Sequence, residues 1–171
     1  MNPMKNIRIE KVTLNIGAGK SQDKLEKGVK LLSTISHATP VKTVTQKRIA
    51  QWGLRPGLPI GCKVTLRGEE ANKLLVVLLG AKDQKLSSRQ FDNEGNVAFG
   101  IHEYIDIPGS KYDPAIGVMG LQVCITLERP GFSIRKRRLR SARVPANHRI
   151  KRQEAIDFMK ENFKVLISEE Q

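Results

Sequence analysis

Two basic segments without a single acidic residue constrain this chain more than any other feature of its sequence. Residues 129–152 contain ten lysines and arginines, and residues 40–67 contain six. The whole chain has a formal net charge of +13, so the residues outside these two segments sum to −3. Ordinary protein surfaces intersperse both signs of charge. This separation favours a polyanionic partner, above all a nucleic acid, over a generally solvated surface.

The length and composition are typical of a single cytoplasmic domain. With 171 residues, 39% hydrophobic and 5% aromatic, the chain can build a core mainly of Val, Ile and Leu. Two cysteines give no disulfide framework, and the sequence opens without a signal-peptide pattern. The longest apolar run, residues 74–79, is too short to span a bilayer. We therefore expect one domain over residues 1–171 and no membrane partner.

Hydrophobic periodicity predicts an α+β fold, with a mostly antiparallel sheet and helices packed on one face. Glycine at position 80 is expected to cap the second helix in the left-handed conformation. A loop over residues 47–60 and a basic arm over residues 129–152 are expected to project from this body. The predicted strands cover residues 8–16, 41–47, 61–67, 97–101 and 121–127, and the predicted helices cover 21–36, 69–79 and 152–162.

Three of these strands repeat one design, in which apolar and polar side chains alternate. Val12, Leu14 and Cys62 belong to the apolar side. Hydroxyl, amide and cationic groups donate hydrogen bonds, which phosphate and sugar oxygens accept. The polar side is either an RNA-binding face or a plain solvated face. Its members are Lys11, Thr13, Asn15, Lys63, Thr65, Arg67, Gln122, Cys124 and Thr126.

The segment between the second and third predicted strands combines cations, proline, glycine and the only tryptophan of the chain. Such long loops are often functional. Trp52 can stack on a base or sugar, or it can pack against the root of the loop, and the sequence does not decide between these. The candidate contact residues of the loop are Lys47, Arg48, Gln51, Trp52, Arg55 and Pro56.

In the basic arm, residues 134–140 place cations on every side of any regular element, so the run needs a counter-charge. We expect this partner to be RNA. A disordered basic tail is the alternative, but an apolar pattern continues beyond the arm at Ile156 and Met159. The candidate rRNA-binding residues of the arm are Arg135, Lys136, Arg137, Arg138, Arg140, Arg143, Arg149, Lys151 and Arg152.

Residues 17–21, with the sequence GAGKS, look like the end of a phosphate-binding loop, and a phosphate-handling enzyme is the rival hypothesis. The full motif requires glycine at position 14, where this chain has Leu14. The helix start beside Lys20 can still receive a nucleic-acid phosphate. The three histidines are scattered, and neither cysteine has a partner at zinc-ligand spacing. We expect no catalytic residue, metal, cofactor or small-molecule substrate.

Three motifs closely resemble the universal ribosomal protein five family of the large subunit. They are residues 12–17 (VTLNIG), 59–68 (PIGCKVTLRG) and 91–96 (FDNEGN), and the resemblance covers about residues 5–128. Residues 61–68 are the most specific part. The arm over residues 129–152 departs from the bacterial pattern and resembles the archaeal and eukaryotic branch.

The resemblance implies a structural protein that binds 5S rRNA and helps to attach it to the large-subunit rRNA in the central protuberance. It also implies contacts with P-site tRNA through the basic loop, with a small-subunit protein across an intersubunit bridge, and with neighbouring protuberance proteins. Residues 109–120, with Tyr112 and Asp113, are the candidate bridge contact. Together with the strand pattern, the resemblance gives this 5S rRNA-binding set: Lys11, Thr13, Asn15, Gly17, Lys20, Lys63, Thr65, Arg67 and Thr126.

Overall fold

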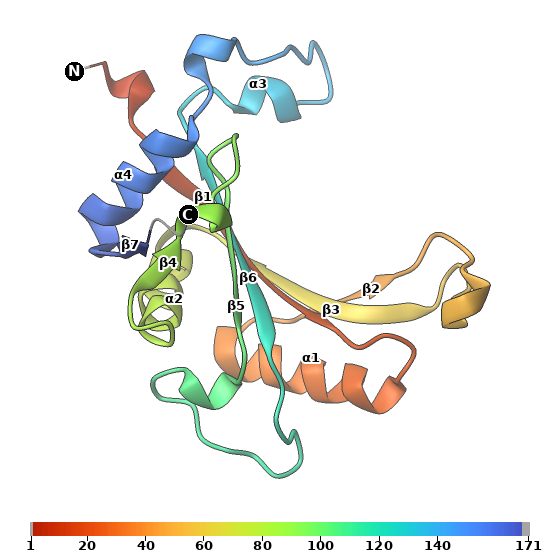
Figure 1. Ribbon diagram of the computed structural model, residues 1–171. Helices are drawn as coiled ribbons and strands as arrows, with labels where there is room; N and C mark the ends of the chain where they lie inside the picture. Colours follow the sequence, from red (N-terminus) through yellow and green to blue (C-terminus); the bar gives the residue numbers. More distant parts are fainter. Residues whose placement is uncertain (1, 169–171) are drawn as a thin grey trace. The chain divides into compact units, whose positions relative to one another are not determined.

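The strongly alternating strands of the sequence form one five-stranded, mostly antiparallel sheet in a computed structural model that describes residues 2–168 (Figure 1). The strand order is β2-β3-β1-β6-β5, and a separate parallel pair joins β4 to β7. This confirms the α+β class. The elements are β1 (Arg8–Gly17), α1 (Gln22–Ser36), β2 (Val41–Val44), β3 (Pro59–Leu66), α2 (Gly68–Gly80), β4 (Lys85–Ser87), β5 (Val97–Ile101), β6 (Leu121–Glu128), α3 (Ser133–Lys136), α4 (Arg152–Phe163) and β7 (Leu166–Ser168).

The chain divides into two compact units. Unit 1 comprises the described residues of 1–12, 67–98 and 125–171, and unit 2 comprises residues 13–66 and 99–124. In unit 2, Leu14, Ile16, Cys62 and Val64 are buried as the alternation predicts. Helix α1 packs on their side of the sheet, and a Cβ added at Gly28 would lie 3.0 Å from the Cys62 sulfur. The polar side of β1 and β3 is therefore the side that α1 does not cover.

Helix α1 begins and ends where the sequence places its signals. The Ser21 hydroxyl accepts a hydrogen bond from the Lys24 amide at 3.5 Å, which caps the first turn. His37 adopts the left-handed conformation at φ 53° and ends the helix ahead of Pro40. Leu25 and Leu32 are buried as predicted, and Val29 is half-buried.

Three local predictions are wrong. Strand β2 ends at Val44 rather than at residue 47, because the register with β3 shifts after Thr43. Gly80 is the last residue of α2 and not a left-handed cap; Asp83 and Gln84 adopt positive φ instead, and the Gln84 amide returns to the Leu79 carbonyl at 3.0 Å. The β4–β7 pair was not predicted, since three-residue strands show no readable period.

In unit 1, helices α2 and α4 bury Leu75, Leu78 and Met159 in a common apolar core. The basic arm joins this core through Val144 and Ile150, which are also buried. The arm contains one short helix, α3, and two long irregular stretches. These apolar anchors argue against the alternative of a merely disordered tail.

Gly61 is a position where only glycine fits. A Cβ there would lie 2.7 Å from the Ile16 carbonyl oxygen and 3.0 Å from the Thr43 hydroxyl oxygen. We expect Gly61→Ala to lower the free energy of unfolding by about 1–3 kcal/mol through overpacking. Denaturant unfolding will measure this. Gly100→Ala in β5 is the matched control, because a Cβ there meets nothing within 4 Å. A comparable loss in both variants would contradict the steric explanation.

Candidate nucleic-acid interface

The polar side of β1 and β3 in unit 2 places several donors side by side. The hydroxyls of Thr13 and Thr65 lie 3.5 Å apart, so these two side chains are direct neighbours across the strands. Lys63 and Thr65 are exposed, whereas Thr13 and Asn15 are half-buried. This surface presents hydroxyl, amide and ammonium groups to solvent, as the strand pattern predicts.

The corner after β1 does not form a phosphate-binding loop. The amides of Ala18 and Gly19 both donate to the Ile60 carbonyl, at 2.9 and 3.0 Å. The backbone donors that would hold a nucleotide phosphate are thus used within the protein. Lys20 is exposed, and its Nζ lies 3.7 Å from a Cβ built at Gly53, so it belongs spatially to the loop rather than to the sheet face.

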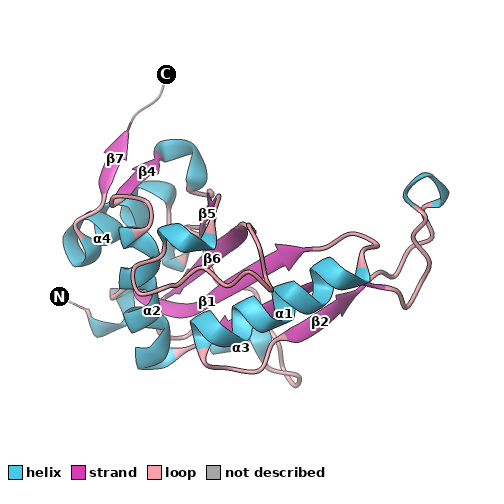
Figure 2. Ribbon diagram, turned by 90° about the horizontal axis from the view of Figure 1, so that it is seen from below, coloured by secondary structure: helices cyan, strands magenta, loops and turns pink. Residues whose placement is uncertain are grey.

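The basic loop is an ordered extension of the β2–β3 hairpin, which runs beyond the end of α1 (Figure 2). The Thr45 amide donates to the Leu58 carbonyl, and the Gly57 amide donates to the Thr45 carbonyl, both at 2.9 Å. Nearer the tip, Ile49 and Leu54 form an isolated antiparallel bridge. These bonds hold the tip in a defined conformation.

All six candidate contact residues of the loop are exposed, namely Lys47, Arg48, Gln51, Trp52, Arg55 and Pro56. Trp52 is 66% exposed, so it does not pack against the root of the loop. Leu54 is buried instead. Of the two roles left open for Trp52, the structure favours the one in which its ring is available to a partner.

In unit 1, the Glu10 carboxylate collects three cations. Its Oε1 lies 2.5 Å from Lys136 Nζ, 3.2 Å from Arg67 Nη1 and 3.9 Å from Lys11 Nζ. Burial raises the pKa of Glu10, but hydrogen bonds from Lys136 and Arg67 outweigh it and hold this pKa below its ordinary value. Lys11 and Arg67, predicted to contact 5S rRNA, therefore lie beside an acid of their own chain.

A second carboxylate fastens the arm to the same unit. Glu128 accepts from Arg8 at 2.7 and 3.0 Å and from Lys136 at 3.3 Å. Lys136 thus bridges Glu10 and Glu128. The expectation that the run 134–140 depends on an external anion is too strong, because its own chain supplies a counter-charge to Lys136 and, through Glu94, to Arg135.

Other arm cations are also used internally. Arg129 is 6% exposed and donates to the Glu154 carboxylate at 2.8 Å and to the carbonyls of His148 and Arg149. Burial raises the pKa of Glu154, but the Lys151 amide and Arg129 lower it overall. Arg152 donates to Ser88 in addition.

The arm also presents free charge. Among residues 2–168, the side chains of Arg138, Arg140 and Arg143 are exposed and form no hydrogen bond or ion pair. Arg137 donates to the Arg140 carbonyl and is likewise exposed. These side chains remain available to a polyanion. The sheet-face candidate of this unit, Thr126, is half-buried.

The candidate bridge segment contains a fixed aspartate beside an exposed tyrosine. Asp113 accepts from Lys30 Nζ at 2.6 Å, and its amide donates to the Tyr104 hydroxyl at 2.9 Å. The Lys30 hydrogen bond holds the pKa of Asp113 below its ordinary value. Tyr112 is 55% exposed. The segment is therefore a pinned loop with one accessible aromatic ring.

The described residues contain no group of three or more His, Cys, Asp or Glu that could hold a metal ion. Burial raises the pKa of Cys62 and of Cys124, which disfavours the reactive thiolate. No helix within residues 2–168 combines the length and apolar character needed to cross a bilayer.

Comparison with known proteins decides the family. The model of ribosomal protein L5 matches residues 2–55, and the model of the C-terminus of the same ribosomal family matches residues 59–158. The chain belongs to the ribosomal protein L5 family. It is therefore a ribosomal protein and, like the family, a structural component rather than an enzyme.

Similar members of the L5 family come from archaea, in agreement with the branch expected from the arm. Each bears the name large ribosomal subunit protein uL5. The protein of Nanoarchaeum equitans is 50% identical, and the alignment covers 97% of this chain and 98% of that one. The protein of Sulfurisphaera tokodaii is 45% identical over 99% of this chain and 96% of its own. That of Methanobrevibacter smithii is 44% identical over 96% and 97%.

Proposed function

We propose that this protein is a structural component of the large ribosomal subunit that binds 5S rRNA and helps to attach it to the large-subunit rRNA in the central protuberance. The carrying observation is the open donor surface of β1 and β3, where Thr13 and Thr65 adjoin and Lys63 is exposed. Such groups match the phosphate and 2′-hydroxyl oxygens of RNA. The absence of acidic residues from 40–67 supports the same partner.

The hairpin tip is the proposed contact with P-site tRNA. Its backbone is fixed by internal hydrogen bonds, while Arg48, Trp52 and Arg55 are exposed. A preformed tip loses little conformational entropy on binding, and an exposed indole stacks on bases or sugars. Lys20 adds a cation beside this tip.

Two further surfaces complete the proposal. The free arm cations, Arg138, Arg140 and Arg143, are assigned to the large-subunit rRNA. Residues 109–120 are assigned to the small-subunit bridge protein, because Tyr112 is exposed on a loop that Lys30 and Asp113 hold in place. Neighbouring central-protuberance proteins are the other expected partners of this ribosome-bound molecule.

Replacing both Lys63 and Thr65 by alanine tests the assignment of 5S rRNA to the sheet face. We expect the double variant to weaken 5S rRNA binding by about tenfold or more, since a charge-assisted hydrogen bond and a neutral one are lost. Filter binding at moderate salt will measure the dissociation constant. Both side chains are exposed, so thermal stability should not change.

Arg55→Ala in the hairpin tip is the control for this experiment. It removes an equally exposed cation from the other proposed RNA surface. We expect 5S rRNA binding to stay within about twofold of the wild type, because only non-specific attraction is reduced, and tRNA binding by assembled ribosomes to weaken. If both variants lose 5S rRNA binding alike, the division of labour between face and loop is wrong. Equal affinity of the wild type for any RNA would refute the 5S assignment itself.

A further inference from the structure

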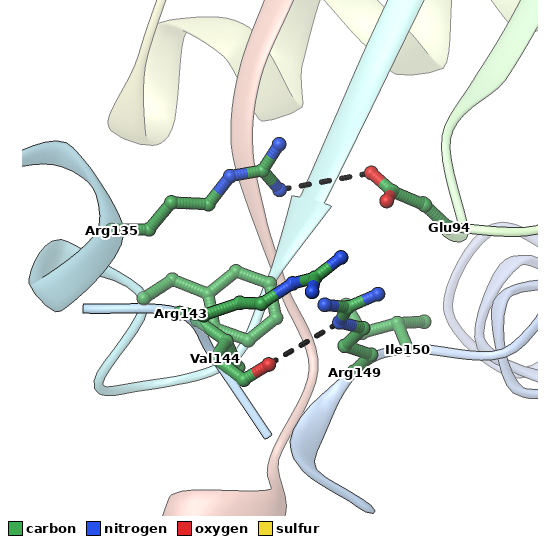
Figure 3. Close-up of a pocket in the computed structure, with 7 residues that line it drawn as sticks. Glu94, Arg135, Arg143, Val144, Arg149 and Ile150 are labelled. Atoms are coloured by element: carbon green, nitrogen blue, oxygen red, sulfur yellow. Dashed lines mark hydrogen bonds and ion pairs between the residues drawn. The ribbon is translucent and has the colours of Figure 1, made fainter. Parts of the chain in front are cut away.

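A pocket of about 180 Å³ lies within unit 1, where three segments of the basic arm approach the turn after residue 91 (Figure 3). A single buried water needs only about a tenth of that volume, so a group of phosphate size fits. Figure 3 shows side chains of the arm and Glu94 directed toward a common space. The lining residues include Glu94, Phe132, Arg135, Arg143, Arg149 and Ile150.

The charges around this pocket do not balance. It brings together three guanidinium groups and one carboxylate. Arg135 lies 3.7 Å from Glu94, and both side chains are more than half exposed, so this ion pair is loose. Arg149 spends only its Nε on the Val144 carbonyl, at 3.3 Å, and Arg143 donates no hydrogen bond within the described chain.

Paired guanidinium groups with free terminal nitrogens fit the oxygens of a phosphodiester, which they can bind with two parallel hydrogen bonds. An anion would also relieve the repulsion between the arginines, which lie in one small space. Arg143 and Arg149 are the groups best able to do this, because neither is held by a carboxylate in the part of the chain that the structure describes.

Glu94 narrows the choice of ligand further. A carboxylate only accepts hydrogen bonds and repels a bare phosphate, so a pocket that contains it suits a ligand with a donor beside its anionic group. A ribonucleotide is such a ligand, because its 2′-hydroxyl lies beside the backbone phosphate, whereas a deoxyribonucleotide lacks that donor. Phe132 and Ile150 supply an apolar wall for the sugar or base.

We propose that this pocket binds one ribonucleotide of the RNA along which the arm lies, with Arg143 and Arg149 on the phosphate and Glu94 accepting from the 2′-hydroxyl. The proposal rests on the proposed RNA-binding function of the arm. It adds a specific claim, that the arm distinguishes RNA from DNA at this point and is not a purely electrostatic contact.

The first test compares two arginines that differ only in their relation to the pocket. Arg143 lines it and Arg138 does not, and both are exposed without a hydrogen bond in residues 2–168. The probes are a short single-stranded RNA of mixed sequence and the DNA of the same sequence, with binding followed by fluorescence anisotropy of the full chain. We expect Arg143→Gln to weaken RNA binding by about tenfold and Arg138→Gln by about twofold. Equal losses would overturn the proposal.

The second test changes the acceptor and keeps its size. If Glu94 reads the 2′-hydroxyl, Glu94→Gln should strengthen DNA binding, because repulsion is removed, but not RNA binding, so the preference for RNA falls by at least about threefold. If affinities for RNA and DNA rise equally, Glu94 merely repels phosphates and the proposal fails. If the two arginine variants behave alike while the wild type still binds 5S rRNA, only the pocket assignment is lost. Failure of the wild type to bind 5S rRNA would instead refute the proposed function.

Discussion

Raising the salt concentration from about 50 to 200 mM is expected to weaken the binding of this protein to 5S rRNA by on the order of a thousandfold, if six phosphates are neutralised. The structure makes this number of contacts attainable. Three of the ten arm cations form ion pairs with the protein's own carboxylates, and seven do not. The exposed cations of the hairpin tip and Lys63 add to these.

The measurement is the slope of the logarithm of the binding constant against the logarithm of salt concentration. Arg138→Gln should reduce the magnitude of this slope by about one if that side chain meets a phosphate. Lys136→Gln provides a contrast, because Lys136 is already neutralised by Glu10 and Glu128 and should change the slope less. A nearly flat slope for the wild type would show that its free cations face something other than phosphate.

Arg129→Met is expected to lower the free energy of unfolding by about 2–3 kcal/mol, the largest stability effect that we predict for a single side chain. The guanidinium is almost fully buried, and its loss leaves two carbonyls and Glu154 without their donor. Glu154 is 40% exposed, so water compensates in part. Denaturant unfolding near neutral pH will give the difference.

Two further variants show whether the cause is the lost partner. Arg138→Met removes an exposed arm cation with no partner in the described chain and should leave stability within about 0.5 kcal/mol. Combining Arg129→Met with Glu154→Met should recover part of the loss, because no unpaired carboxylate then remains. If the double variant is less stable than Arg129→Met by the full cost of another contact, the ion pair is not what Arg129 contributes.

Much of the interface was predictable because its determinants are local. Alternation along β1 and β3 separates buried Leu14 and Cys62 from exposed Lys63 and Thr65, and the structure confirms this division. The Pro- and Gly-rich composition of 47–60 predicts an exposed loop with equal success. The fate of Trp52 was not predictable, because nothing in its neighbours along the sequence decides whether the apolar slot at the root of the loop goes to the indole or, as observed, to Leu54.

The sequence by itself determined the fold class, the faces of the strands and the presence of two concentrations of positive charge, since periodicity and charge are properties of consecutive residues. Only the tertiary structure decided which cations are free. Arg8 meets Glu128, and Lys136 meets Glu10, across separations of more than a hundred residues. No local pattern encodes such pairs, because a salt bridge forms wherever folding brings two charges within a few ångströms, and the same folding leaves Arg143 without a carboxylate beside it.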